Sequence, residues 1–263
     1  ISFEPRKYIT DKGLKCLPVT NSLRELALEE SLFVGDCYLE TLPSFSNLTS
    51  LYLADCSFVA SKLSHVTQMT NLKKLTLRFT PKYGRVLHHI RSLTQLNHLE
   101  LLNCHVDTST VHWISQLTNL THLRYTGIMS RIYEALPHIA KLTKLRALDI
   151  STPVKLTGGL KALTALTSLT DLSLSRSVTS SFDLLEALPR LTNLDLSYFG
   201  IQSDPSILQQ LTNYTQLRRI DLSGWSKQLI AYFQDLLDLK LLNVKIVNRE
   251  PVLESVNYRN KYY

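Results

Sequence analysis

The side chains best placed to do chemistry in this sequence are two histidines and a glutamate near the middle of the chain. His98 and His122 are 24 residues apart, and Glu100 follows His98 by two positions. Imidazole and carboxylate groups hold a zinc ion when three or four of them converge on it. This arrangement supplies two or three ligands and no obvious fourth, so we predict neither a metal site nor a cofactor.

Motifs that carry catalysis are absent from the sequence. It contains no H-E-x-x-H, Walker, G-x-S-x-G or G-x-G-x-x-G segment. These patterns place a metal, a phosphate, a serine nucleophile or a dinucleotide on a suitable turn or helix. Gly158 and Gly159 form a pair, but without the context of a phosphate loop. We therefore predict that the chain is not an enzyme.

Positive charge is spread along the chain. The 263 residues carry a formal net charge of +7, of which residues 1–130 contribute +3 (13 basic minus 10 acidic) and the rest +4 (16 minus 12). Nucleic-acid-binding proteins usually gather basic side chains in a patch or stripe, so we expect no nucleic-acid partner. No apolar run approaches the roughly 20 residues that cross a bilayer, so we expect no membrane span.

Cysteine usage bears on the compartment. The four cysteines form no C-x-C or C-x-x-C pair: Cys16, Cys37, Cys56 and Cys104. Small secreted domains often depend on a cysteine framework, so this pattern favours reducing conditions and a cytoplasmic location. The alternative is an extracellular location, which the glycosylation sequons at Asn47, Asn119 and Asn213 permit. Two of these sequons repeat the phrase N-L-T, which the packing of a repeat also explains.

One apolar pattern recurs along the chain. The motif L-x-x-L-x-L appears ten times at spacings of 22 to 26 residues, with Tyr, Ile or Val in place of one leucine in four of the copies. Its copies begin at Leu23, Leu48, Leu72, Leu96, Leu120, Leu145, Leu169, Leu191, Leu217 and Leu239. The positions six and nine residues before each start are apolar in every copy. Because these positions keep their phase, each copy is one structural unit of a repeat array.

The spacing within a unit predicts its structure. The L-x-L core alternates as a half-buried strand does, and the preceding apolar positions step by three as in a short helix or 3₁₀ segment. Stacked units share one core and bring their strands into a parallel sheet. The sequence therefore predicts an α/β solenoid of about ten units, curved like a horseshoe with the sheet on its concave face. We assign residues 1–247 to the solenoid and 248–263 to a C-terminal tail or cap.

These residues resemble the leucine-rich-repeat family over positions 14–247. Residues 48–56 and 96–104 fit the family pattern L-x-x-L-x-L-x-x-C, and residues 9–17 are similar to units of F-box-associated repeat proteins. The ninth position holds other residue types elsewhere, so we expect gaps in the usual ladder of Asn or Cys side chains at the turns. The resemblance implies the leucine-rich-repeat fold and a role in binding.

Residues between the leucines alternate with them and therefore point toward the concave face. Neighbouring parallel strands lie about 4.8 Å apart, so side chains at equivalent positions can touch. We predict that Glu100, Arg124 and Asp149 form a ladder of alternating charge. This ladder is either a solvated ion network that contributes little to stability or a polar recognition patch.

The two halves of the predicted concave face differ in charge. The first half is mixed and the second is acidic, which favours a protein partner with a basic segment. The alternative is that aspartate before serine belongs to the consensus of the repeat. The candidate partner-binding residues on the concave face and rim are Tyr52, Lys74, Arg78, His98, Glu100, His122, Arg124, Asp149, Asp171, Asp195, Tyr198, Arg219 and Asp221.

The rim of the predicted arc carries irregular loops and aromatic residues. Loops on a rigid scaffold often bind partners, and here they fall around residues 79–85, 127–133, 151–159 and 198–206. Tyr198 and Trp225 lie in successive units and form either a rim patch or, for Trp225 and Phe199, part of the core. Cys56 and Cys104 share an inward position, so we expect buried thiols.

Together these features predict a non-catalytic protein–protein interaction module that binds through its concave face and rim loops. Such a module acts as a scaffold, a substrate receptor or an effector. The alternative is a receptor-type extracellular recognition ectodomain. The sequence leaves the partner and the oligomeric state open.

Overall fold

Short strands in sequence order form a single parallel sheet. The computed structural model describes residues 2–3, 22–29, 40, 42–54, 60–78, 84–104, 108–126, 132–151, 160–177, 182–198, 205–240 and 242–249. Within these residues the sheet has eleven strands. They are β1 (Ser2–Phe3), β2 (Glu25–Glu29), β3 (Ser50–Ala54), β4 (Lys74–Arg78), β5 (His98–Leu102), β6 (His122–Thr126), β7 (Ala147–Asp149), β8 (Asp171–Ser173), β9 (Asn193–Asp195), β10 (Arg219–Asp221) and β11 (Lys245–Val247).

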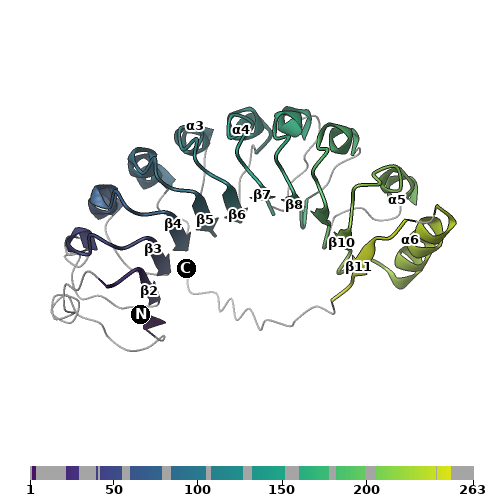
Figure 1. Ribbon diagram of the computed structural model, residues 1–263, viewed down its shortest axis with the longest axis horizontal. Helices are drawn as coiled ribbons and strands as arrows, with labels where there is room; N and C mark the ends of the chain where they lie inside the picture. Colours follow the sequence, from purple (N-terminus) through teal and green to yellow (C-terminus); the bar gives the residue numbers. More distant parts are fainter. Residues whose placement is uncertain are drawn as a thin grey trace, which may run out of the picture.

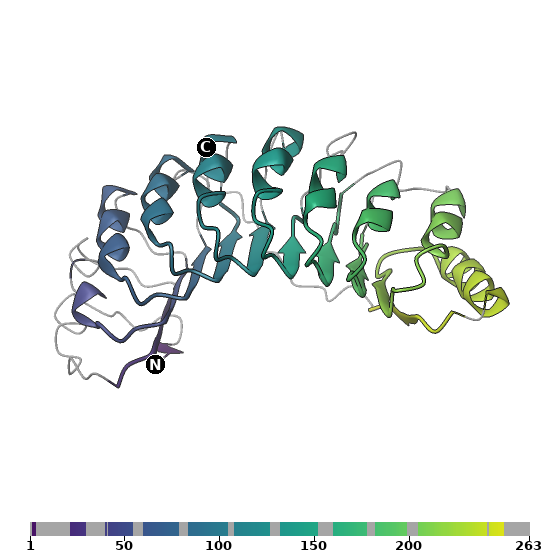
Figure 2. The same ribbon diagram turned by 45° about the horizontal axis from the view of Figure 1, so that its top comes forward.

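Helical segments connect successive strands and are short. The 3₁₀ helices are η1 (Leu42–Ser44), η2 (Ala60–Gln68), η3 (Gly84–Ser92), η4 (Leu160–Ala165) and η5 (Asp183–Ala187). The α-helices are α3 (Thr108–Ile114), α4 (Ile132–Ile139), α5 (Pro205–Leu211) and α6 (Lys227–Leu239). The strands line the inner side of an arc and the helical segments its outer side (Figure 1). A turned view shows the same two layers (Figure 2), so the predicted horseshoe-shaped α/β solenoid is confirmed.

The core lies between these two layers and runs through the arc. Strand leucines such as Leu51 and Leu53 are fully buried and alternate with half-buried neighbours that face the concave side. The apolar position six residues before each motif is buried wherever the structure describes it, in nine of ten copies. These residues are Leu42, Val66, Ile90, Ile114, Ile139, Leu163, Leu185, Leu211 and Phe233. The phase of the repeat therefore correctly identifies the inward positions.

The predicted register of the last unit is wrong. The tenth motif places Leu241 opposite Arg219, but Lys245 occupies that place. Helix α6 begins at the N-cap Ser226, runs through 13 residues and ends at Leu239, the predicted first leucine of the motif, which is 80% exposed. Because helix α6 continues to the start of this motif, the last strand begins four residues after its predicted position.

The first strand also departs from the prediction. β1 pairs in parallel with β2 and lies ahead of the first motif. At the other end β11 finishes at Val247, where we placed the end of the solenoid. That domain boundary stays a prediction, because residues 250–263 lie outside the described part of the chain.

The N-L-T phrase links neighbouring units through hydrogen bonds. Asn119 Nδ2 donates to the carbonyl oxygen of Thr94 over 3.0 Å, and Thr121 Oγ1 donates to that of Asn97 over 3.0 Å. Asn119 Oδ1 in turn accepts from Lys144 Nζ of the next unit over 2.8 Å. These contacts support a packing role for this phrase.

Different side chains satisfy the turns after the strands. Cys104 is buried, and its Sγ lies 3.5 Å from the carbonyl oxygen of Leu77 in the preceding unit, as the prediction of an inward thiol requires. Trp225 packs against the core, and its indole N–H donates to the carbonyl oxygen of Leu196 over 2.8 Å. Of the two predicted alternatives, a rim patch or part of the core, Trp225 therefore takes the second. Cys16, Cys37, Cys56 and Phe199 lie outside the described residues.

Truncation of a core leucine tests the stacking. We expect Leu172→Ala to lower the free energy of unfolding by about 2–5 kcal/mol, because Leu172 is 2% exposed and its removal leaves a cavity between units. Leu239→Ala is the matched control, since that side chain is 80% exposed. Urea unfolding followed by circular dichroism measures both, and equal losses would contradict the assigned core.

Candidate binding groove

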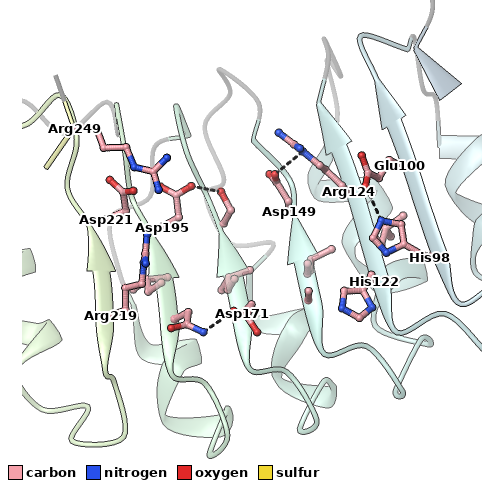
Figure 3. Close-up of a pocket in the computed structure, with 17 residues that line it drawn as sticks. His98, Glu100, His122, Arg124, Asp149, Asp171, Asp195, Arg219, Asp221 and Arg249 are labelled. Atoms are coloured by element: carbon pink, nitrogen blue, oxygen red, sulfur yellow. Dashed lines mark hydrogen bonds and ion pairs between the residues drawn. The ribbon is translucent and has the colours of Figure 1, made fainter. Parts of the chain in front are cut away.

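A groove of about 390 Å³ runs along the concave side of the sheet from β5 to β10 (Figure 3). Its lining includes nine of the thirteen candidate residues predicted from the sequence. These nine are His98, Glu100, His122, Arg124, Asp149, Asp171, Asp195, Arg219 and Asp221. The fold therefore brings into one hollow residues that are as much as 123 positions apart in the sequence (98 to 221).

The other four candidates lie outside the groove. Tyr52 is half-buried on β3, and Lys74 and Arg78 lie at the ends of β4, on the N-terminal side of the hollow. Tyr198 lies in the turn after β9, on the rim. The structure thus separates the predicted surface into a groove and its surroundings.

The predicted charge ladder forms at one of its two steps. The register aligns Glu100 with Arg124 and Arg124 with Asp149. Arg124 Nε lies 3.1 Å from Asp149 Oδ2, but Glu100 approaches His98 Nε2 at 2.6 Å and Lys74 Nζ at 3.9 Å. The Arg124 side chain is 52% exposed, so its ion pair contributes at most about 1 kcal/mol to stability.

The two groove histidines stack on neighbouring strands. The ring centroids of His98 and His122 are 5.1 Å apart with an interplanar angle of 23°. Burial lowers the pKa of His122, with further lowering from His98, while Asp171 opposes the shift. Within the described part of the chain, no three His, Cys, Asp or Glu side chains converge as a metal site would require.

Aspartates of the second half close the turns after their strands. Asp195 Oδ1 accepts a hydrogen bond from Ser197 N over 2.8 Å, and Asp221 Oδ1 accepts one from Ser223 N over 3.0 Å. Asp149 Oδ1 does the same for Ser151, whose amide donates over 3.0 Å and whose hydroxyl also donates. At these three positions the D-x-S sequence is therefore a structural turn element.

Hydroxyl groups connect these carboxylates across strands. Ser151 Oγ and Ser173 Oγ are 3.0 Å apart, and Ser173 Oγ donates to Asp195 Oδ2 over 2.8 Å. Nearer the start of β8, Asp171 accepts hydrogen bonds from Asn193 Nδ2 and Thr170 Oγ1, each over 2.5 Å. The network holds the acidic side chains in fixed positions before any ligand arrives.

Asp149 is a groove carboxylate with a raised pKa. Burial raises the pKa of this carboxyl, and the charge of Asp195 adds to the rise. The hydrogen bonds from Ser151 and the charge of Arg124 oppose the shift without cancelling it. Additional positive charge in this part of the groove would therefore favour the ionised carboxylate.

Two arginines lie at the β10–β11 end of the groove. Arg219 is half-buried at the start of β10, and the exposed Arg249 follows β11, with its backbone N–H donating to Ser223 Oγ over 2.8 Å. Figure 3 shows the Arg249 side chain reaching over the strands toward Asp195. Arg249 is not among the residues predicted from the sequence, because the predicted register of the last unit is four residues off and does not place it opposite Ser223.

The rim beside this end carries an exposed aromatic ring. Tyr198 is 43% exposed, and its backbone adopts a left-handed φ of 53° in the turn after β9. Its ring lies against Gly224, where an added Cβ would approach Tyr198 Cδ1 to 2.6 Å. Gly224 itself has φ of 83°, which favours glycine. Of the predicted rim loops, residues 79–83, 127–131, 152–159 and 199–204 lie outside the described residues.

Comparison with known proteins identifies the architecture. No protein-family model and no curated protein matches the sequence. An internalin (inlF) from Listeria monocytogenes is 20% identical with a TM-score of 0.56, over 100% of this chain and 72% of that one. Internalin C2 (inlC2) from the same species is 22% identical with a TM-score of 0.51, over 70% and 75%. The chain has the leucine-rich-repeat fold.

A third leucine-rich-repeat neighbour was solved with a nucleic acid. TLR13, in its complex with ssRNA13, is 19% identical with a TM-score of 0.53, over 76% of this chain and 31% of that one. At these identities the likeness concerns the fold of the solenoid alone. Among the described helices of this leucine-rich-repeat chain, none has the length and apolar character of a membrane span.

Removal of the guanidinium of Arg124 tests the electrostatics of the groove. We expect Arg124→Gln to raise the pKa of Asp149 further, because Arg124 stabilises the ionised carboxylate. Titration of the Asp149 carboxyl carbon by NMR measures the shift. Arg190→Gln, in an exposed turn before β9, is the control that should leave the pKa of Asp149 unchanged. Indistinguishable titrations in the two variants would refute the pairing.

Histidine titration predicts a loss of stability on acidification. Burial lowers the pKa of His89, His122 and His138, so the unfolded chain binds more protons than the folded one below about pH 6.5. The melting temperature should therefore fall from pH 7.5 to pH 5.5, and His138→Gln should reduce that fall. The raised pKa of Asp149 has the opposite sign, because the folded chain holds this proton more tightly than the unfolded one, and comparison with His138→Gln isolates the histidine contribution. Differential scanning calorimetry gives the result, and a constant or rising melting temperature would show the sign to be wrong.

Proposed function

We propose that this chain is a non-catalytic protein-binding module whose concave groove receives a segment of a partner protein. The observation that carries the proposal is the groove itself, in which nine predicted residues from six successive strands line one continuous hollow. Polar side chains that face one hollow on a rigid scaffold suit recognition. A scaffold, a substrate receptor or an effector would use such a surface.

Charge in the groove supports a partner with a basic segment. Five carboxylates and three guanidinium groups line it, giving a formal charge of −2 with neutral histidines, while the whole chain carries +7. Between β7 and β10 the side chains Asp149, Asp171, Asp195 and Asp221 supply the negative charge. A basic segment would be drawn to this half of the groove and repelled by much of the remaining surface.

The hydrogen bonds of the groove support binding with little rearrangement. Ser151, Ser173 and Ser197 hold the carboxylates of β7 and β9 in place. Side chains that are already ordered lose less conformational entropy when a ligand binds. A short peptide segment can therefore gain useful affinity from this surface.

The TLR13 complex makes RNA the second candidate ligand, since that neighbour carries the same fold. RNA binding depends on neutralising phosphates with Lys and Arg side chains. The net negative charge of this groove opposes that, so we favour a protein partner.

The cysteine pattern favours a cytoplasmic location, and the hydrogen bonds of Asn119 show that its sequon also serves packing. Glycans on Asn119 in the native protein would support the extracellular alternative.

Peptide binding tests the proposal directly. We expect fluorescence anisotropy to show that a labelled eight-residue Lys/Arg peptide binds and that an acidic peptide and a single-stranded RNA do not. The variant Asp171→Asn with Asp221→Asn should weaken binding about tenfold, or about 1.4 kcal/mol, while keeping a side-chain oxygen acceptor at both positions. Its matched control is Asp235→Asn with Asp238→Asn on the exposed side of α6.

Two results would count against the proposed function. One is equal weakening by the groove variant and the α6 control, which would indicate general attraction to negative charge. The other is preferential binding of the RNA or of the acidic peptide. Circular dichroism of each variant confirms that the fold is retained before affinities are compared.

A further inference from the structure

The two arginines in the β7–β10 part of the groove lie at one end, beside Asp195 and Asp221, and the other end carries two further carboxylates. Arg219 and Arg249 lie at the end formed by β10 and the residues after β11, and Asp149 and Asp171 lie on β7 and β8 (Figure 3). The proposed function uses only the net charge of this region. The order of the charges along the groove carries more information about the ligand.

The arginine end has donors that the protein leaves unused. Within the described residues, neither the Arg219 nor the Arg249 guanidinium forms a hydrogen bond or an ion pair. The nearby carboxylates are engaged elsewhere: Asp195 accepts from Ser197 N and Ser173 Oγ, and Asp221 accepts from Ser223. Each guanidinium presents five N–H donors in a planar fork that matches a carboxylate. This end is suited to an anionic group of the ligand.

The acidic end has room for a cation. Ala147 and Ser173 lie beside Asp149 and Asp171, and their small side chains leave space between the two carboxylates. Burial raises the pKa of Asp149 and the charge of Asp195 adds to the rise although Arg124 is in contact, so added positive charge there would stabilise the carboxylate. A lysine or arginine side chain of the ligand would supply it.

The distance between the ends sets the spacing in the ligand. β10 is two strands from β8 and three from β7, which at about 4.8 Å per strand places the ends roughly 10 to 14 Å apart. An extended peptide advances about 3.3 Å per residue, so three or four residues cover this span. Six strands line the whole groove, which extends over roughly 24 Å and exceeds a single small zwitterion.

We propose that the groove recognises an extended peptide segment that carries an acidic and a basic side chain three or four residues apart. The carboxylate of the ligand binds Arg219 and Arg249, and its basic side chain binds Asp149 and Asp171. This inference rests on the proposed function and deepens it. It predicts selection by charge spacing, which net charge alone does not produce.

Peptides of identical composition test the spacing. One set places a single Glu and a single Arg one, four or eight positions apart in a ten-residue peptide of Ser and Ala, in both orders. We expect isothermal titration calorimetry to show that a four-residue spacing, in one of the two orders, binds at least about tenfold tighter than the other spacings. Equal affinity for all spacings would overturn the inference.

Charge reversal tests the two ends separately. Arg219→Glu with Arg249→Glu should abolish the preference for the Glu-containing peptide and create one for the peptide in which Lys replaces Glu. The matched control is Lys161→Glu with Arg190→Glu, which makes the same charge change at exposed positions that do not line the groove. A reversal variant that retains the original preference also overturns the inference, provided that its circular dichroism and melting temperature match those of the control.

The two proposals fail in different ways. Binding of the Lys/Arg peptide without any effect of the acidic residue leaves the proposed function intact and removes the spacing rule. Absence of binding by both the Lys/Arg peptide and the Glu-Arg peptides removes both. An RNA that binds in place of every peptide also removes both.

Discussion

Burial of leucine between neighbouring units is the constraint on which the rest of this structure depends. The described strands have two to five residues and the helical segments three to thirteen, so one unit cannot cover its own apolar side chains. Leu99 and Leu123, paired in register on adjacent strands, are almost fully buried because each unit covers the next. Stability therefore comes from interfaces between units, and every unit must adopt the same register as its neighbours.

The same stacking organises the polar side of the sheet. When the leucines of two strands align, the residues between them align as well, so positions 22 to 26 apart in sequence become neighbours. Asp149, Ser173 and Asp195 form a connected hydroxyl–carboxylate network for this reason. The packing of the core therefore determines which outward positions are neighbours, and the sequence determines which side chains occupy those positions.

The parts of the structure that the sequence predicts are those controlled by burial. Nine leucine motifs and the inward positions before them recur with a constant phase, which a shared core requires. Two features escaped prediction because local energetics decide them. Extension of α6 past Leu239 shifted the last strand and concealed Arg249, and Glu100 turned to His98 and Lys74 although the register placed Arg124 opposite it. The repeat pattern determines the strand on which a charged residue lies. The rotamer of its side chain then determines which charged residue it contacts.

The groove aspartates can form the turns and also bind a ligand. The D-x-S turns engage Oδ1 of Asp149, Asp195 and Asp221, and a carboxylate has about four lone-pair sites on its two oxygens, so acceptor capacity remains after the turn has formed. The turns thus require side-chain oxygen acceptors at these three positions whatever the ligand is. Arg219 and Arg249 are different, because within the described residues their guanidinium groups serve neither a turn nor the core. In the proposed function the aspartates attract a basic segment, and the two arginines are where selectivity between ligands can reside.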